Sequence, residues 1–485
     1  MIDPKLKAQY TTTIGIECHV QLKTNTKLFS AVGNDAREAP ANSLVSHIDF
    51  GLPGALPVLN KEALTLAVKA AFALGTEPER FSKFDRKHYF YPDLPKGYQI
   101  TQFDEPIIGK GAITIQVDGQ PKLIGITRAH MEEDAGKSTH PAGTDYSLVD
   151  LNRAGTPLLE IVSEPDMHTS AEAKAYAYEL YLRMRYAEVS EANLYYGNMR
   201  FDVNVSVSKT DQLGTRSETK NLNSFRSVEK AVDYEVERQI NVLERGESVV
   251  QETRGWNDDK QATFSQRSKE NADDYRYMPD PDIPPVELDE AFIAAIKADM
   301  PLLPDDYRSK FAAIDFDGKV VADILAVPES AKLVAQILDT AGPEHARRIA
   351  FWLMLNTPTD EEPTVTAAPI APAEQLIKLS QLVADNKLSS TAAKEVLAVL
   401  QQQGGDVEAI ATSKNLMQES DENAIAAIVT EVLAANPKAA EDVKNGEMKA
   451  IGFLVGQVMK QSQGKANPAL AQQLIKRQLA LPKEG

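Results

Sequence analysis

Apolar and polar residues alternate along the stretch Ile14–Leu22, and this alternation predicts a β-strand. Successive side chains of a strand point to opposite faces, so the apolar residues at even positions form one face. Glu17 and His19 then share the other face. A carboxylate and an imidazole on one face suit a divalent cation or a general acid/base pair. The alternative is an ordinary strand whose polar face lies in water.

A second stretch, Asn198–Val207, alternates in the same way and predicts another strand. The polar segment Ser208–Gly214 is typical of a hairpin connection, and Thr215–Asn221 forms the returning strand. Together the two strands present polar side chains on one face: Arg200, Asp202, Asn204, Glu218 and Lys220. These groups either form a salt-bridged surface or supply the acids and bases needed around Mg²⁺ and a phosphorylated intermediate.

Helical patterns are interspersed with these strands and then replace them. Thr169–Glu172 is typical of a capping box and predicts a helix that ends near Glu188. Another helix is predicted from about Phe225 to Arg245. Four prolines in Met278–Pro285 exclude a continuing helix or a central strand, so a domain boundary is placed there. Beyond it, successive amphipathic segments predict a helical bundle.

The C-terminal part of the chain predicts a small, separable helical tail. Thr357–Ala373 is rich in proline and acidic residues, which predicts a flexible connector or a long loop. Three short helices are expected after it, at Ser389–Gln402, Asp421–Ala435 and Glu447 to about Gln461.

Composition limits the classes of protein to which this chain can belong. Its 485 residues suggest two to four domains, and its single cysteine, Cys18, excludes an internal disulfide or a thiolate metal cluster. The sequence shows no membrane-spanning stretch and no secretory signal, so we expect a cytoplasmic location and no membrane partner. The net charge of −18 argues against general binding of nucleic acid, but Lys449–Lys483 contains basic residues and no acidic ones. This segment either contacts a phosphate backbone or is a helix surface on which cations happen to gather.

Two further acidic positions are candidates for chemistry. Glu132, Glu133 and Asp134 are adjacent, and such repelling charges are tolerated in water or around a cation. Glu160 lies within the apolar run Leu158–Val162, where a buried carboxylate needs a cation, a hydrogen-bond donor or a proton. A nucleotide-binding P-loop is not present, because Met131 occupies the position of the required first glycine.

Several segments, taken in order, resemble one known family, the B subunits of aspartyl/glutamyl-tRNA(Asn/Gln) amidotransferases. The resemblance runs from about residue 10 to the end of the chain. The matching segments are Gly15–Thr24, Gly51–Asn60, Asp85–Asp93, Leu151–Val162, Glu218–Phe225, Arg267–Glu270 and Asp274–Tyr277.

The resemblance implies an α+β fold with three domains. The expected domains are a catalytic cradle with a mixed or antiparallel sheet at residues 1–292, a helical domain at 293–408, and a YqeY-like tail that binds tRNA at 409–485. It also implies a ligase that uses ATP and Mg²⁺, with Mn²⁺ as a possible substitute, and glutamine as the source of the amide nitrogen. Its substrates would be Glu on tRNA(Gln), Asp on tRNA(Asn), or both. The side-chain carboxylate would be phosphorylated and the acyl phosphate then attacked by ammonia.

The resemblance also implies site residues and partners. The expected metal ligands are Glu17, His19, Glu132, Glu133, Glu160, Asp202 and Glu218. Among the expected catalytic residues, the resemblance implies Glu133, Glu218 and Lys87, the last on the path of ammonia. Arg200 and Lys220 are added from the polar face of the two paired strands described above. An amidase A subunit would supply the ammonia, and a small C subunit would complete a heterotrimer. No structural zinc is expected, since Val45–Asp49 lacks the cysteine pair of some relatives.

Two other functions are compatible with the same residues. The chain would be a non-catalytic tRNA-binding scaffold if the cradle carboxylates were merely solvated. It would be a stand-alone amide ligase for small molecules if neither the basic tail nor a separate source of ammonia were needed.

Overall fold

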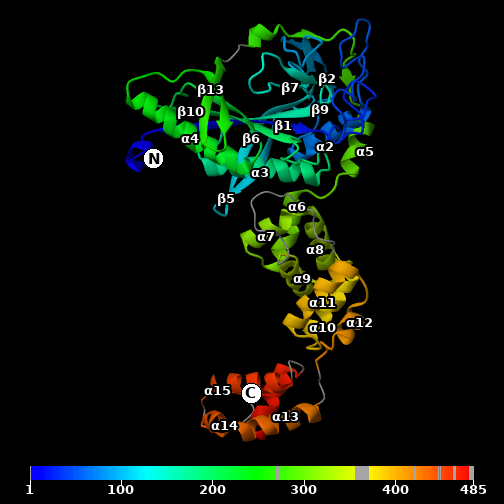
Figure 1. Ribbon diagram of the computed structural model, residues 1–485, viewed down its shortest axis with the longest axis vertical. Helices are drawn as coiled ribbons and strands as arrows, with labels where there is room; N and C mark the ends of the chain where they lie inside the picture. Colours follow the sequence, from blue (N-terminus) through cyan, green and yellow to red (C-terminus); the bar gives the residue numbers. More distant parts are fainter. Residues whose placement is uncertain are drawn as a thin grey trace. The chain divides into compact units, whose positions relative to one another are not determined.

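The computed structural model describes residues 2–268, 272–354, 371–418, 422–445, 447, 449–462 and 466–479. Two compact units make up the chain, the first ending at Asp306 and the second beginning at Tyr307 (Figure 1).

An eight-stranded sheet forms the centre of the first unit. All neighbouring strands are antiparallel except β11 and β12, which are parallel. The order across the sheet is β13 (Ala262–Ser268), β12 (Glu252–Asn257), β11 (Ser217–Leu222), β10 (Met199–Ser208), β1 (Thr11–Gln21), β9 (Pro157–Ser163), β6 (Gln120–Glu133) and β5 (Gly111–Val117). The predicted hairpin is therefore confirmed as β10 and β11, and the predicted first strand as β1.

Strand β1 has two chemically different faces, as its sequence predicts. The side chains of Ile14, Ile16, Cys18 and Val20 are fully or almost fully buried. Each buried aliphatic side chain contributes roughly 1.5–3 kcal/mol through removal from water. The intervening residues, including Glu17 and His19, remain partly exposed on the opposite face.

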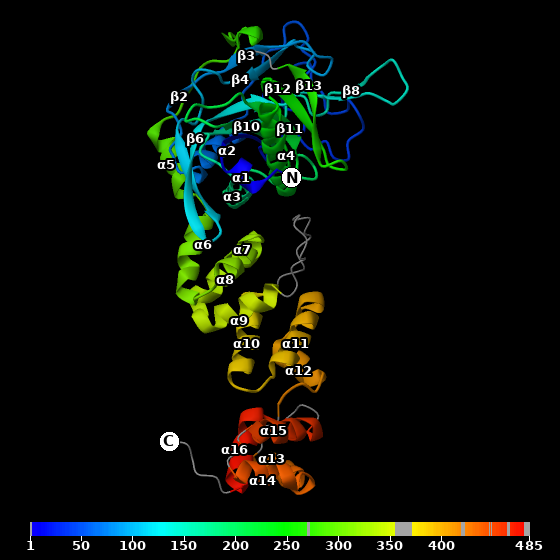
Figure 2. The ribbon, with the colours of Figure 1, turned by 90° about the vertical axis from the view of Figure 1, so that its left-hand side faces the viewer.

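Helices cover the apolar face of the sheet. They are α2 (Lys61–Ala73), α3 (Ser170–Tyr186) and α4 (Phe225–Glu244); α3 packs against β1 and β5, and α4 packs against β10 and β11 (Figure 2). Thr169 and Ser224 cap α3 and α4 through side-chain oxygens that accept backbone N–H groups, which explains why these helices begin where they do. Both helix predictions in this part of the chain are confirmed. The short α1 (Pro4–Lys7) precedes β1, and α5 (Glu290–Ala298) packs against α2.

Short strands form a second layer over the polar face. One small sheet contains β14 (Met278–Pro279), β3 (Asp85–His88) and β4 (Tyr98–Thr101), and β4 packs against β6. The pairs β15 (Val286–Glu287) with β2 (Phe81–Ser82) and β7 (Lys137–Thr139) with β8 (Leu148–Asp150) complete the unit, with the 3₁₀ turn η1 (Ala272–Tyr275). Strand β14 lies at a sheet edge, where its missing proline N–H costs no ladder hydrogen bond. The unit is thus α+β, as predicted.

The second unit is helical, as predicted. Its earlier helices are α6 (Pro304–Phe311), which begins just before the boundary, η2 (Ala312–Ile314), α7 (Gly318–Leu325), α8 (Pro328–Ala341), α9 (Pro343–Met354), α10 (Ala373–Ala384), α11 (Ser390–Gln403) and α12 (Val407–Ser413). The predicted connector Thr357–Ala373 lies outside the described residues except for its last three.

The last helices share a hydrophobic core of their own. They are α13 (Glu422–Ala435), α14 (Pro437–Lys444), α15 (Lys449–Gln461) and α16 (Pro468–Gln478). Their core is built from side chains such as Val429, Leu454 and Ile475. Helices α11, α13 and α15 confirm the three short helices predicted from the sequence. Among the described residues, none of the helices has both the length and the apolar character needed to cross a membrane.

Candidate functional site

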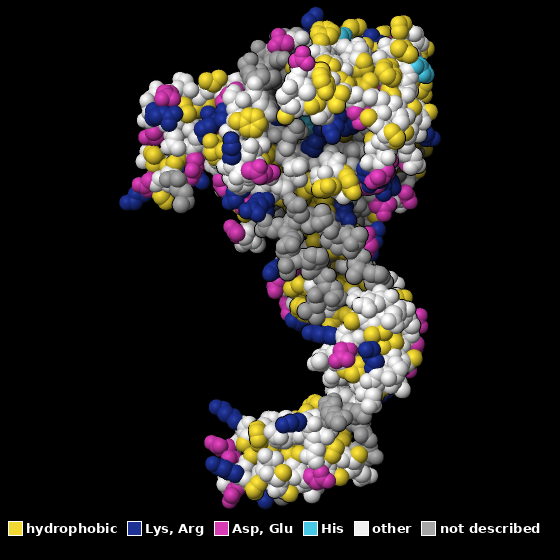
Figure 3. Space-filling view, viewed as in Figure 1, with side chains coloured by type: hydrophobic (Ala, Val, Ile, Leu, Met, Phe, Trp, Pro, Cys, Tyr) yellow, Lys and Arg dark blue, Asp and Glu magenta, His cyan; other side chains and the backbone are white. Residues whose placement is uncertain are grey.

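A cavity of about 540 Å³ opens on the polar face of the large sheet. Its walls come from β1, β6, β9, β10 and β11, from β3, and from the segment around Tyr275 and Tyr277. In the space-filling view, Lys and Arg side chains gather in a hollow of this unit (Figure 3). The ionisable side chains other than tyrosine that line the cavity are Glu17, His19, Lys87, Arg128, Glu132, Asp134, Glu160, Arg200, Asp202, Arg216, Glu218 and Lys220.

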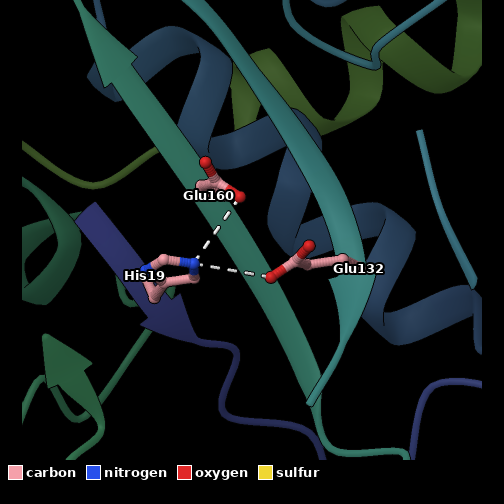
Figure 4. A group of neighbouring side chains, drawn as sticks. All are labelled: His19, Glu132 and Glu160. Carbon is pink, nitrogen blue, oxygen red and sulfur yellow. Dashed lines mark ion pairs between the residues drawn. The ribbon is translucent and has the colours of Figure 1, made fainter. Parts of the chain in front are cut away.

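One group of possible metal ligands comes from three neighbouring strands. His19 on β1, Glu160 on β9 and Glu132 on β6 point toward one another (Figure 4). His19 Nε2 lies 3.5 Å from Glu160 Oε2 and 3.6 Å from Glu132 Oε1. The strand register explains this arrangement, because His19 stands directly opposite Glu160 across β1 and β9. Residues separated by many positions along the chain are thus brought to one point by strand pairing.

The charges in this group depend on one another. Burial disfavours the imidazolium of His19, but the hydrogen bond and charge of Glu160 and the charge of Glu132 outweigh burial and raise the pKa of His19 to about 9. Burial alone would raise the pKa of Glu160, yet His130 and His19 lower it well below its usual range. Glu160 is therefore ionised beside the cationic imidazole of His19. A metal ion bound here would replace the proton on His19 Nε2.

A second group lies beside the first. Glu17 on β1, Asp202 on β10 and Glu218 on β11 place one oxygen each within 4.8 Å of the others. Glu17 stands opposite Asp202 across β1 and β10. Lys220 Nζ donates to Asp202 Oδ2 at 2.8 Å and lies 3.3 Å from Glu218 Oε1. Asn204 Nδ2 donates to Glu17 Oε1 at 3.1 Å, which fixes that carboxylate.

The acids of the second group differ in their proton affinity. Burial and the nearby charges of Glu160 and Glu218 raise the pKa of Glu17. Burial also opposes ionisation of Asp202, but Lys220 and His19 outweigh it and lower the pKa of Asp202. Lys220 is thus a fixed cation beside ionised Asp202. Burial alone would lower the pKa of Lys220, but the charges of Asp202 and Glu218 outweigh burial and raise it.

Two other predicted residues reach the same cavity. Arg200 Nη2 donates to Asp134 Oδ2 at 3.1 Å. The Nζ atom of Lys87 lies 4.9 Å from the ring centre of Tyr275, and both side chains line the cavity. Of the predicted site residues, all but Glu133 are therefore brought to one cavity.

Glu133 is placed elsewhere. It ends β6 directly after Glu132, so its side chain points to the opposite face of the strand. Its carboxylate pairs with Lys96 Nζ and accepts the Ile100 backbone N–H at 2.9 Å. The structure thus does not join Glu133 to either group of ligand atoms, because adjacent strand residues cannot share a face.

Some residues at the site escaped the sequence reasoning. Arg128 and His130 alternate with Glu132 along β6, so extending the strand pattern backward from Glu132 would have found them. An aromatic wall also lines the cavity, with the rings of Phe103 and Tyr277 stacked at 4.0 Å between centres. No periodic signal marks this wall, since Phe103 and Tyr277 come from loops far apart in the sequence.

Family models match most of the chain. The model described as the GatB/GatE catalytic domain matches residues 12–294, and the model described as the GatB domain matches residues 338–479. The chain belongs to the GatB family. The first match contains both groups of ligand atoms and all of the large sheet apart from Thr11, the first residue of β1.

Curated relatives cover nearly the full length of this family member. One, from Carboxydothermus hydrogenoformans, is 45% identical over 484 residues, which cover 97% of this chain and 99% of the relative. Another, from Thioalkalivibrio sulfidiphilus, is 46% identical over 480 residues, which cover 97% of this chain and 100% of the relative. A third, from Alkalilimnicola ehrlichii, is 46% identical over 481 residues, covering 97% and 99%. Each of the three is named as the B subunit of an aspartyl/glutamyl-tRNA(Asn/Gln) amidotransferase, so the resemblance found in the sequence is confirmed.

Proposed function

We propose that this chain is the B subunit of a tRNA-dependent amidotransferase and carries the phosphorylation and amidation site. Its substrates are Glu attached to tRNA(Gln), Asp attached to tRNA(Asn), or both. The observation that carries the proposal is that two groups of carboxylate and imidazole ligands share one cavity with Lys and Arg side chains. Membership of the GatB family supports the same activity.

The reaction needs an activated carboxylate. An oxygen of the substrate carboxylate attacks the γ-phosphorus of ATP, and ADP leaves. The product is an acyl phosphate, whose carbon is then attacked by ammonia. The carbon–oxygen bond breaks, phosphate leaves, and one proton of the ammonium nitrogen is lost to give the amide. Phosphorylation matters because phosphate is a far better leaving group than oxide.

The residues of the cavity fit divalent cations. His19, Glu132 and Glu160 would hold one ion, and Glu17, Asp202 and Glu218 a second. Oxygen-rich sets with a single imidazole suit Mg²⁺ or Mn²⁺. When bound, such ions neutralise phosphate oxygens and so lower the barrier to phosphoryl transfer.

The cations of the chain itself have separate tasks. Lys220 holds Asp202 and Glu218 together and offsets their charge, since its Nζ contacts both carboxylates. Arg200, fixed by Asp134, and Lys87 place positive charge on the cavity wall. Fixed cations of this kind stabilise the charge that develops on a transferring phosphoryl group.

Ammonia has to come from elsewhere. Cys18 is the only cysteine of the chain, and it is buried on the apolar face of β1, where burial raises the pKa of its thiol. It is therefore no glutaminase nucleophile. We propose that an amidase A subunit releases ammonia from glutamine in a cytoplasmic heterotrimer with a small C subunit, and that the basic C-terminal segment contacts tRNA.

The decisive test is an amidation assay with the partner subunits, ATP, Mg²⁺ and each misacylated tRNA. Glu160→Gln should lower the rate of amide formation by about 100-fold, because it removes a ligand charge from the first group. Glu38→Gln, at an exposed position, serves as the matched control and should leave the rate unchanged. Wild-type turnover in Glu160→Gln would overturn the proposal and favour a non-catalytic tRNA-binding scaffold.

A further inference from the structure

Three side chains form one row across the sheet. Glu160 on the middle strand β9 stands opposite His19 on β1 and opposite His130 on β6. Residues that face each other across paired strands point to the same side of the sheet. The carboxylate of Glu160 therefore lies between two imidazoles, of which only His19 belongs to the groups of ligand atoms described above.

His130 contacts the carboxylates of Glu160 and Glu132 without lining the cavity. Its Nε2 atom lies 3.3 Å from Glu160 Oε2 and 3.7 Å from Glu132 Oε2. The side chains of His19, Glu132 and Glu160 line the cavity, whereas His130 is not among the lining residues and is only 4% exposed. His130 thus touches both acids of the first group without access to a substrate in the cavity.

The other nitrogen of His130 has no task of its own. Nδ1 is buried and has no hydrogen-bond partner among the described residues. A buried polar atom without a partner costs stability, so an apolar side chain of similar size would pack better at this position. The polar contacts of the ring that the structure shows go to the two carboxylates.

We propose that His130 is a positioning residue that orients Glu160 and Glu132 for the divalent cation of the first group. This inference rests on the proposed function, in which those two acids and His19 hold the ion. His130 Nε2 faces Oε2 of both carboxylates and so fixes their orientation: in Glu160 this same oxygen also faces His19, whereas Glu132 turns its other oxygen, Oε1, toward His19. Hydrogen-bond partners of this kind typically change metal affinity by about 10–100-fold when removed.

The test is a Mn²⁺ titration of the full-length chain, with free Mn²⁺ followed by electron paramagnetic resonance. Three variants separate the roles of the two ring nitrogens. His130→Gln places an amide N–H near the position of Nε2 and should keep the dissociation constant within about threefold of wild type. His130→Asn reaches only the position of Nδ1, and His130→Leu fills the volume alone. Both should weaken Mn²⁺ binding by about 10–100-fold.

Controls make each outcome interpretable. His140→Gln, at an exposed position, should bind Mn²⁺ like wild type, and thermal unfolding shows whether every variant is folded. Equal affinity in His130→Asn and His130→Gln would overturn the positioning role, even if His130→Leu fails to fold. His19→Ala tests the ion site itself. If wild type shows no saturable Mn²⁺ site, the metal part of the proposed function fails. If wild type has the site and His130→Asn binds Mn²⁺ equally well, only the positioning inference fails.

Discussion

At the scale of single residues, Glu132 and Glu133 show how one peptide unit separates two tasks. Glu132 faces the cavity and His19, whereas Glu133 pairs with Lys96 on the other side of β6. Lys96 and Glu133 are both almost completely buried. A buried pair of this kind is costly to break, because the remaining charge is left without a partner.

The two neighbours should therefore respond differently to the same substitution. Glu132→Gln should weaken Mn²⁺ binding about tenfold or more, with little effect on unfolding. Glu133→Gln should leave Mn²⁺ affinity nearly unchanged but destabilise the first unit by about 3 kcal/mol, because Lys96 loses its counter-ion. Mn²⁺ titration and thermal unfolding of both variants test this. Loss of Mn²⁺ affinity in a stable Glu133→Gln variant would contradict the assignment of Glu133 to the other face.

Alternation also defines what the sequence could and could not predict at this scale. A period of two places Glu17 and His19 together, and Asp202 with Asn204, since each pair lies within one strand. It also separates Glu132 from Glu133, a consequence that the predicted ligand set ignored. The meeting of His19 with Glu160 depends on the order and register of strands, which a local pattern does not contain.

At the scale of elements, helix α4 supports the strand that carries Glu218. Glu235 on α4 is fully buried, and it accepts hydrogen bonds from Ser217 at 2.6 Å and from Arg238 at 2.8 Å. Arg254 lies 3.0 Å from the same carboxylate. Burial by itself would raise the pKa of Glu235, but Arg238 and the hydroxyl donors outweigh it, so its pKa is lowered. Ser217 directly precedes Glu218 on β11, so this network holds the strand that carries a ligand of the second group.

A lowered pKa makes this support dependent on pH. The network around ionised Glu235 stabilises the folded chain at pH values above the ordinary Glu pKa of about 4.3. This stabilisation is lost as the pH falls through the pKa that Glu235 has in the folded chain. Glu235→Gln should therefore reduce stability by about 3 kcal/mol at pH 7, and by less at pH 4. Urea unfolding, followed by the fluorescence of Trp256 in a Trp352→Phe background, reports on the first unit.

The control for this experiment lies on the same helix. Glu229 forms a partly exposed pair with Lys174 at 3.2 Å, so Glu229→Gln should change stability by only about 0–1 kcal/mol at either pH. A loss in Glu235→Gln that is equal at pH 7 and pH 4 would argue against an ionised Glu235.

Elements were more predictable than their assembly. Caps such as Thr169 and Ser224 mark helix starts in the sequence, and α3, α4 and the β10–β11 hairpin lie where local patterns predict them. The neighbours of β1 do not follow from such patterns. They are β9 and β10, which begin more than a hundred residues later. Strand β10 packs against α4 and strand β1 packs against α3, and no window of neighbouring residues records such long-range contacts.

At the scale of the whole molecule, the C-terminal helices α13–α16 have a core separate from the first unit. Their basic residues include Arg477, whose Nη1 lies 2.6 Å from Glu422 Oε1. Lys449 and Lys460 lie on α15. The domain limits near residues 292 and 408 stay predictions, although the first family match ends close to the former, at residue 294.

A separate core predicts that the tail can be removed without loss of the cradle. A chain that ends at Gln418 should keep the unfolding transition of the first unit, because none of the core residues of α13–α16 belongs to that unit. Its affinity for misacylated tRNA, measured at one fixed salt concentration, should fall about tenfold, or roughly 1.4 kcal/mol. Unchanged affinity would remove the tail from the proposed tRNA contacts.

Strand β1 contributes one ligand to each group, His19 to the first and Glu17 to the second. Alternate residues of a strand lie about 6.7 Å apart, and the backbone of β1 is held by hydrogen bonds to both neighbours. The interval between the two proposed ions is therefore built into the main chain, not into adjustable rotamers. Inserting a single amino acid before Glu17 would move Glu17 and His19 together to the apolar face of the strand, or else move the apolar residues to the polar face. Both groups of ligand atoms would therefore be lost together or kept together.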